Sequence, residues 1–412
     1  MVGDSITAQH LHSNYFEAFC YARYPQLNFA FRNSGVGGHT IPSTLARFDY
    51  DVAAWKPTVV SVELGMNDSG GTATDKFVAN MGTMVERIGS IGARPVILAA
   101  SPVNDGTLMA NLAGRNQRLH EYAAALQDFC VERKLPYADQ FHALVDVWGQ
   151  NKPNETLASS LATIGTLARN EKTVGVEHLR AFLAAQAKNS RKLVSMQGDP
   201  VHPGPNGQLL MAAALLHALG ADGFVSSATV DAKGTVAEAE GCQVDGVRAT
   251  ANGVAFDRLD ERLPFPIPDA TTDAMALLPT VADLSRWTLT VKGLQPGLHS
   301  LKLDGVTLPV GLSADLWAQG VNVTYMAHAP GTKIGQVSPA LAQSRAILQA
   351  VAAKETLVSQ FRGLSQRAHA AGADAALKTE LAALGKKVEE ADAKIREAAW
   401  PAKHRWELVP TP

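Results

Sequence analysis

Short apolar runs alternate with longer amphipathic stretches over the first part of this 412-residue chain. The runs 59–64, 95–100 and 135–141 have the length of strands. The intervening stretches 76–91 and 111–134 have the length and apolar spacing of helices. This alternation predicts an α/β fold, with a doubly wound, mostly parallel sheet between two layers of helices. Functional sites on such sheets form at the carboxyl ends of the strands.

A serine lies close to the start of the chain, in the tetrapeptide Gly-Asp-Ser-Ile at residues 3–6. A serine hydroxyl attacks a carbonyl only if a base accepts its proton and fixed donors stabilise the oxyanion. The segment Asp199-Pro200-Val201-His202 places a carboxylate three residues before an imidazole. Within one turn the acid can orient the ring while the other ring nitrogen faces Ser5. Ser5, His202 and Asp199 are therefore the candidate nucleophile, base and orienting acid.

Two further segments carry candidate oxyanion donors. Residues 33–38, Asn-Ser-Gly-Val-Gly-Gly, form a glycine-dense loop whose backbone can turn an N–H toward a ligand, which makes Gly38 one candidate. Asn67 follows the predicted strand and offers a side-chain amide N–H. With the backbone N–H of Ser5, the donors are Ser5, Gly38 and Asn67. Each fragment alone is more typical of ordinary turns, helix caps or surface pairs, and only the combination indicates catalysis.

In this order and spacing, the four segments resemble the sequence blocks of the SGNH hydrolase superfamily, also called GDSL esterases and lipases. The resemblance covers residues 1–225 and implies a flavodoxin-like three-layer sandwich. It also implies a Ser5–His202–Asp199 triad, an oxyanion hole of Ser5, Gly38 and Asn67, and no metal or organic cofactor. Family members usually carry a full apolar strand before the Gly-Asp-Ser turn, whereas only Met1 and Val2 precede it here. We therefore expect a stub of a first strand and a less stable scaffold.

The activity implied by the resemblance is ester hydrolysis through an acyl-enzyme. Short-chain acyl esters, including O-acetyl groups on carbohydrate, are the favoured substrates, and lysophospholipids or thioesters are the alternatives. A protein of another class, a noncatalytic glycan-binding protein, is the competing interpretation. Intact residues for every chemical role argue against it, because loss of activity leaves no reason to keep them all.

Composition limits the other classes of protein to which the chain could belong. Hydrophobic residues make up 46% of the chain, the formal net charge is −2, and neither a basic stripe nor an apolar run long enough for a membrane span is present. We therefore expect no nucleic-acid partner and no membrane span. Cys20, Cys130 and Cys242 lack metal-ligand or disulfide spacing. The pair His10 and His12 would face different sides of a helix, which disfavours a metal site. No signal peptide is visible, and secretion or a periplasmic location are alternatives for the compartment.

The catalytic blocks do not require residues 143–195. Asn154 and Thr156 can cap a helix, and the stretches 157–167 and 174–187 have helical spacing. Since this insertion leads into Asp199 and His202, a helical lid or pocket wall and a packing insertion without substrate contact are equally compatible with it.

Residues 226–335 predict a small antiparallel β-module. The dipeptides Asp245-Gly246, Asn252-Gly253 and Asp304-Gly305 are typical of hairpin turns between the short runs 254–256, 287–291 and 298–303. The segment 294–306 resembles the β-sandwich modules fused to some bacterial GDSL esterases, for which carbohydrate binding is one role.

Residues 336–412 predict a helical hairpin. Ser338 and Pro339 form a cap and first turn, Gly372 separates two apolar stripes, and Pro401 ends the second helix. The hairpin is expected to close on one of the preceding domains, with a homo-oligomer contact as the alternative.

Overall fold

A parallel five-stranded sheet forms the centre of the first half of the molecule, in the order β2-β1-β3-β4-β5. The computed structural model describes residues 1–107, 109–148, 155–188, 196–251, 253–328, 336–372 and 374–411. Every pairing in this sheet is parallel. The strands are β1 (Val2–Gly3), β2 (Ser34–Gly35), β3 (Val59–Glu63), β4 (Arg94–Leu98) and β5 (Tyr137–Ala138).

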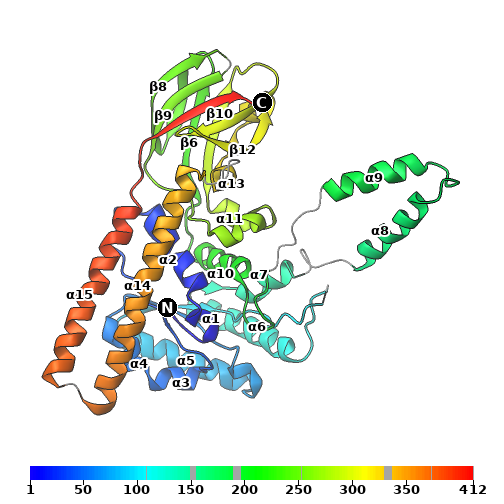
Figure 1. Cartoon of the computed structure of the whole chain (residues 1–412). Coiled ribbons are helices and arrows are strands. Elements are labelled where there is room, and N and C mark those ends of the chain that lie inside the picture. The colour runs from blue at the N-terminus through cyan, green and yellow to red at the C-terminus, as the bar shows by residue number, and fades with distance from the viewer. Residues whose placement is uncertain are drawn as a thin grey trace.

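Helices cover both faces of this sheet, which confirms the predicted α/β sandwich (Figure 1). On one face, Val62 and Ile97 pack in a buried cluster with Met81 and Ile88 of α5. On the other, Val96 and Leu98 pack against Leu215 of α10. The covering helices are α2 (Leu11–Arg23), α3 (Ile41–Ala46), α5 (Thr74–Ser90), α6 (Arg115–Arg133), α7 (Gln140–Asp146) and α10 (Pro205–Ala218).

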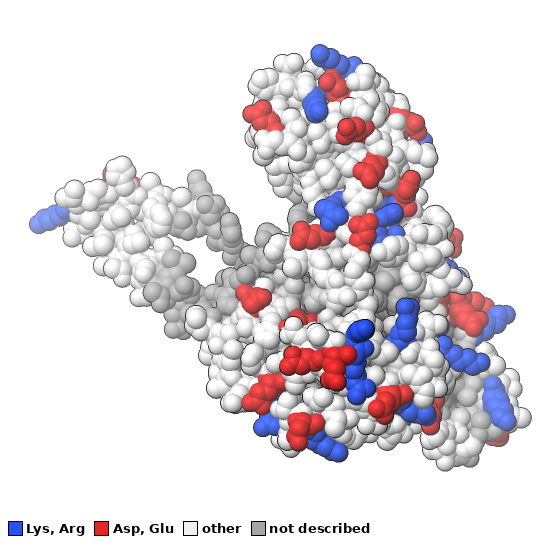
Figure 2. Space-filling model, turned by 180° about the vertical axis from the view of Figure 1, so that it is seen from behind, with Lys and Arg blue, Asp and Glu red and all other residues white. Residues whose placement is uncertain are grey.

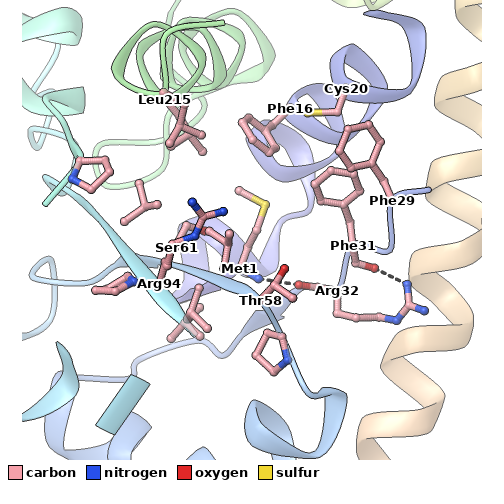
Figure 3. Close-up of a pocket in the computed structure, with 18 of the residues that line it drawn as sticks. Met1, Phe16, Cys20, Phe29, Phe31, Arg32, Thr58, Ser61, Arg94 and Leu215 are labelled. Carbon is pink, nitrogen blue, oxygen red and sulfur yellow. Dashed lines mark hydrogen bonds between the residues drawn. The ribbon is translucent and has the colours of Figure 1, made fainter. Parts of the chain in front are cut away.

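Strand β1 is the stub expected from the sequence, yet it lies inside the sheet, between β2 and β3, and pairs with both. Val2 lies opposite Ser34 of β2 and Val62 of β3. A cavity of about 860 Å³ lies at the amino ends of the strands, lined by aromatic and aliphatic side chains that include Met1, Phe16 and Phe31 (Figure 3). Ser5 follows the opposite, carboxyl end of β1 and does not line this cavity.

Two further sheets form the β-module, with strand orders β13-β10-β6-β7 and β12-β11-β14-β9-β8. Tryptophans from both sheets meet between them, because Trp287 packs edge-on against Trp406 at a centroid distance of 5.0 Å. The strands are β6 (Phe224–Asp231), β7 (Thr235–Glu240), β8 (Cys242–Thr250), β9 (Gly253–Asp260), β10 (Arg286–Lys292), β11 (Leu298–Leu303), β12 (Val306–Ser313), β13 (Val321–Asn322) and β14 (His404–Pro410).

The β-module differs from the sequence prediction in two respects. Strands β6 and β10 are parallel, so the module is mixed, not purely antiparallel. The dipeptide Asp245-Gly246 lies within β8 at a register shift, where Gly246 has φ 58°, and so forms a β-bulge instead of a hairpin turn. Asp304-Gly305 does form the β11–β12 turn, whereas Asn252 lies outside the described residues.

The predicted domain boundaries cut through elements of the structure. The boundary between residues 225 and 226 lies inside β6, which starts at Phe224. Strand β14, assigned to the C-terminal segment 336–412, pairs between β9 and β11 of the β-module. The segment with η3 (Asp269–Leu277) and α11 (Pro279–Asp283) contributes side chains such as Phe265 to the core around α10. Part of the predicted β-module therefore packs into the core of the first domain, while the two sheets enclose a separate core.

The C-terminal hairpin consists of α14 (Pro339–Ala371) and α15 (Ala375–Ala398), which run side by side (Figure 1). The Ser338 hydroxyl caps α14 by accepting a hydrogen bond from the Leu341 N–H. Helix α14 packs along α2 and α4 (Phe48–Asp51). The remaining short helices, α12 (Ala314–Gln319) and α13 (Thr324–His328), lie in the β-module.

The insertion contains two helices, α8 (Glu155–Ala168) and α9 (Val176–Lys188), which pack against each other and project from the body of the molecule (Figure 1). Asn154 and most of the basic stretch 188–192 lie outside the described residues. None of the helices in the described ranges is both long and apolar enough to cross a bilayer. Acidic and basic side chains are interspersed on the face seen in Figure 2.

Candidate active site

Ser5 is the first residue of α1 (Ser5–Ala8), directly after β1. Asp4 caps this helix, since its Oδ1 accepts a hydrogen bond of 2.9 Å from the Ile6 N–H. Gly3 permits the tight turn, because a Cβ there would lie 2.0 Å from Thr7 Oγ1. The strand-to-helix turn therefore presents a partly exposed Ser5 at the carboxyl edge of the sheet.

His202 and Asp199 complete a hydrogen-bonded chain to Ser5. His202 Nε2 lies 2.8 Å from Ser5 Oγ, and His202 Nδ1 lies 2.8 Å from Asp199 Oδ2. The Asp199 carboxylate also accepts backbone N–H bonds from Val201 and His202, at 2.8 and 2.9 Å. These backbone bonds, with the imidazole contact, lower the pKa of Asp199 below 3.8. The acid is thus ionised and holds the ring with Nε2 toward Ser5.

The glycine-dense loop lies next to Ser5. Gly38 has φ 77°, a conformation that favours glycine. A Cβ on Gly37 would lie 3.8 Å from Ser5 Cβ. Asn33 fixes the start of the loop, because its Oδ1 accepts from the Gly35 N–H while its Nδ2 donates to the Thr7 carbonyl. The structure thus brings the predicted donor Gly38 to the same edge as Ser5.

Asn67 follows β3 and reaches the same site. Its Nδ2 donates to the His39 carbonyl at 3.0 Å and to Asp4 Oδ2 at 3.3 Å. The amide therefore bridges the glycine loop and the turn that carries Ser5. Since both of its N–H groups have protein acceptors, donation to an oxyanion requires that one contact lengthen, and the longer contact to Asp4 is the weaker one.

Buried carboxyl groups lie beneath the serine. Burial, with the charge of Asp68, raises the pKa of Asp4 to about 6. Burial and the charge of Asp4 raise the pKa of Glu63 well above its usual range. Glu63 Oε2 accepts a hydrogen bond of 2.9 Å from Thr7 Oγ1. Glu63 is not among the site residues predicted from the sequence, although an acidic residue in an apolar run is a signal that marks it.

The two histidines near Ser5 have separate partners. His10 faces Glu355 of α14 at 3.3 Å, and the buried His12 contacts Gln208 Oε1 at 3.1 Å. Within the described ranges, His, Cys, Asp and Glu side chains form no group of three or more suited to a metal ion. Cys20, Cys130 and Cys242 are buried free thiols.

A serine turn at the carboxyl edge of a parallel sheet, with His202 and Asp199 hydrogen-bonded in series, has the geometry of a candidate serine hydrolase site. The sequence model of the GDSL-like lipase/acylhydrolase family matches residues 1–210, and the chain belongs to this family.

Comparison with solved structures extends the likeness beyond the matched region. A gut microbial diltiazem-metabolizing enzyme is similar over 100% of this chain and 96% of its own, with 18% identity and a TM-score of 0.69. The similarity to an acetylxylan esterase from Geobacillus stearothermophilus covers 53% of this chain and 92% of the esterase chain, with 19% identity and a TM-score of 0.40. No match was found among curated proteins. At these identities, the first similarity shows a shared whole-chain fold.

Proposed function

We propose that this protein is a serine esterase that works through an acyl-enzyme. The observation that carries the proposal is the continuous chain from Ser5 Oγ to His202 and Asp199, with 2.8 Å at each step. Family membership supports acyl hydrolysis as the reaction class. The glycine loop and Asn67 lie beside the serine, which supports an oxyanion hole there.

In the proposed reaction, Ser5 Oγ attacks the acyl carbonyl while His202 Nε2 takes its proton. The N–H groups of Ser5 and Gly38 and the Asn67 amide stabilise the oxyanion, and Asp199 stabilises the imidazolium. The imidazolium then protonates the departing alkoxide, which leaves as the alcohol. Water deprotonated by His202 attacks the acyl-enzyme, and release of the acid returns the proton to Ser5.

Short-chain acyl esters, including O-acetyl groups on carbohydrate, are the proposed substrates. Ser5 and His202 are partly exposed and Asp199 is exposed, so the site faces solvent. The 860 Å³ apolar cavity is lined from the amino ends of the strands and therefore offers Ser5 no acyl-chain tunnel. This arrangement suits a small acyl group on a bulky alcohol.

Hydrolysis of acetyl, butyryl and octanoyl aryl esters, alongside acetylated xylo-oligosaccharides, tests the proposal. Preference for acetyl groups, lost in Ser5→Ala, is the expected result. Preference for octanoyl esters, lysophospholipids or acyl thioesters would replace the substrate class but keep the mechanism. Full turnover by folded Ser5→Ala, or no serine labelling by a fluorophosphonate in the unaltered protein, would reject the mechanism and favour a noncatalytic role.

A further inference from the structure

Arg362 of α14, in the C-terminal hairpin, makes polar contact with the loop beside Ser5. Arg362 Nη1 donates to the Gly35 carbonyl at 3.1 Å, across 327 positions of sequence. Its Nε and Nη2 donate to the two oxygens of Asp51, at 2.7 and 3.2 Å. Such a two-pronged guanidinium contact fixes direction as well as distance. Arg362 thus contacts the backbone three residues before Gly38.

Asp51 connects Arg362 to the other end of the loop. Its buried carboxylate also pairs with Arg47, whose Nε donates to His39 Nδ1 at 3.2 Å. Burial and the charge of Arg47 lower the pKa of His39, so that the ring can accept this bond. The His39 carbonyl in turn accepts the Asn67 amide. Both sides of Gly38 are therefore connected to Arg362, one directly and one through Asp51.

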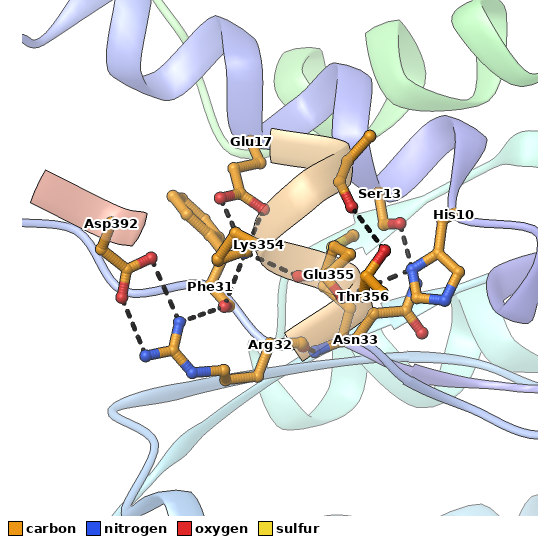
Figure 4. A network of polar contacts seen from close by, with 12 residues as sticks. His10, Ser13, Glu17, Phe31, Arg32, Asn33, Lys354, Glu355, Thr356 and Asp392 are labelled. Carbon is orange, nitrogen blue, oxygen red and sulfur yellow. Dashed lines mark hydrogen bonds and ion pairs between the residues drawn. The ribbon is translucent and has the colours of Figure 1, made fainter. Parts of the chain in front are cut away.

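Further contacts join the hairpin to the segment that leads into the loop (Figure 4). Lys354 donates to the Phe31 carbonyl at 2.9 Å. Arg32 pairs with Asp392 of α15 at 2.8 Å. These contacts hold residues 31–32, whereas Arg362 is the member of the set that reaches the glycine loop itself.

We propose that Arg362 is a positioning residue for the oxyanion loop, so that the C-terminal hairpin is part of the catalytic apparatus. The inference rests on the proposed esterase function. Arg362 contacts no reacting atom, and acts through Gly35 and Asp51. Loss of the Arg362 side chain leaves Ser5, His202 and Asp199 in place. It removes the contacts that fix the loop carrying Gly38 and the His39 carbonyl, which accepts a hydrogen bond from the Asn67 amide. Transition-state stabilisation falls while ground-state binding of a small ester changes little.

The test compares Arg362→Gln, Arg362→Lys and Asp51→Asn with a control on the same helix, Arg345→Gln. Arg345 forms a partly exposed ion pair with Asp269 and lies away from the loop. Activity is expressed per active site titrated with a fluorophosphonate, so that unfolded protein does not count. Arg362→Gln and Asp51→Asn should lower kcat about 10- to 100-fold, with KM within about threefold, since complete loss of one oxyanion donor costs about 10²–10³. Arg362→Lys should recover part of the loss.

A second readout separates positioning from simple stabilisation. The affinity of an aryl boronic acid, which forms a tetrahedral adduct on the serine, should fall in parallel with kcat in Arg362→Gln and stay unchanged in Arg345→Gln. If kcat per titrated site in the Arg362 and Asp51 variants stays within about twofold of the unaltered protein, the inference is wrong and Arg362 only anchors the helix. If Arg362→Gln does not fold, kcat per titrated site in Arg362→Lys and Asp51→Asn tests the inference instead. Failure of the esterase proposal is distinct, because the unaltered protein itself would then lack ester turnover.

Discussion

Lys354 donates to both oxygens of the Glu17 carboxylate, at 2.8 and 2.7 Å, across 337 positions of sequence. Both side chains are buried, and Glu355 lies 2.6 Å from the same ammonium. The pair joins α14 to α2, which follows the short helix α1 that begins at Ser5 (Figure 4). A charged contact of this kind costs desolvation, so its contribution depends on every partner being present.

Replacement of Lys354 should therefore be strongly destabilising. Lys354→Met leaves the Glu17 and Glu355 carboxyls buried without their cation, and we expect a loss of about 3–5 kcal/mol in the free energy of unfolding. Urea denaturation measures this loss. The double variant Lys354→Met/Glu17→Gln should recover part of it, because one orphaned charge is then removed. A loss below about 1 kcal/mol in the single variant would contradict the prediction.

Stability should depend on pH through Asp4. Its folded-state pKa is raised from 3.8 to about 6, so the group favours the folded state while protonated and loses that contribution as pH rises through about 6. Asp4→Asn keeps an acceptor for the Ile6 N–H but cannot ionise. Relative to the unaltered protein, the variant should gain about 2–3 kcal/mol between about pH 4 and pH 7.5. Chemical denaturation at both pH values measures the gain, and a constant stability difference would refute the assignment.

Local patterns predicted the catalytic fold because each of its elements is recognisable within one segment. The run 59–64 became β3 (Val59–Glu63) and the stretch 76–91 became α5 (Thr74–Ser90). The β-module was harder to predict because strand pairing is decided by partners distant in the chain. Strand β14 enters a sheet with β9 and β11, and β6 pairs in parallel with β10. The dipeptide Asp245-Gly246 has the composition of a hairpin turn, but a β-bulge also accommodates a glycine with positive φ.

For the candidate site, the sequence identified groups that lie within short motifs. Ser5, Gly38, Asn67, Asp199 and His202 meet at one edge of the sheet. Arg362 and Asp51 carry no local signal, since an arginine on an amphipathic helix is ordinarily a solvated charge. Only the packing of α14 beside α4 places that arginine on Asp51.

Asn67→Ala tests the amide as an oxyanion donor. It should lower kcat about 10²–10³-fold with little change in KM, because an oxyanion contact strengthens in the transition state. The alternative is that Asn67 only holds the His39 carbonyl and Asp4, with which it makes its contacts in the free protein. In that case Tm would fall, but kcat per fluorophosphonate-titrated site would not. Steady-state kinetics and thermal denaturation of the same preparation separate the two outcomes.

Asp199→Asn tests the orienting acid, and the chain contains a matched control. Asp139 and His142 repeat the Asp-x-x-His arrangement, with Oδ2 2.7 Å from Nδ1 and the same backbone N–H bond to Oδ1, but the ring faces His120 instead of Ser5. We expect Asp199→Asn to lower kcat about 10²–10⁴-fold through loss of ring orientation and imidazolium stabilisation. Asp139→Asn should leave kcat unchanged.

The pH profile provides a second check on Asp199. Because its pKa lies below 3.8, the carboxylate contribution is present above that value and is lost only as pH falls through the lowered pKa. On the alkaline plateau of both pH–rate profiles, the ratio of kcat between the unaltered protein and Asp199→Asn should therefore be independent of pH. A ratio that still changes along this plateau would show that Asp199 titrates there. An equal loss of kcat in Asp139→Asn would show that the effect is not specific to the Asp-x-x-His pair that reaches Ser5.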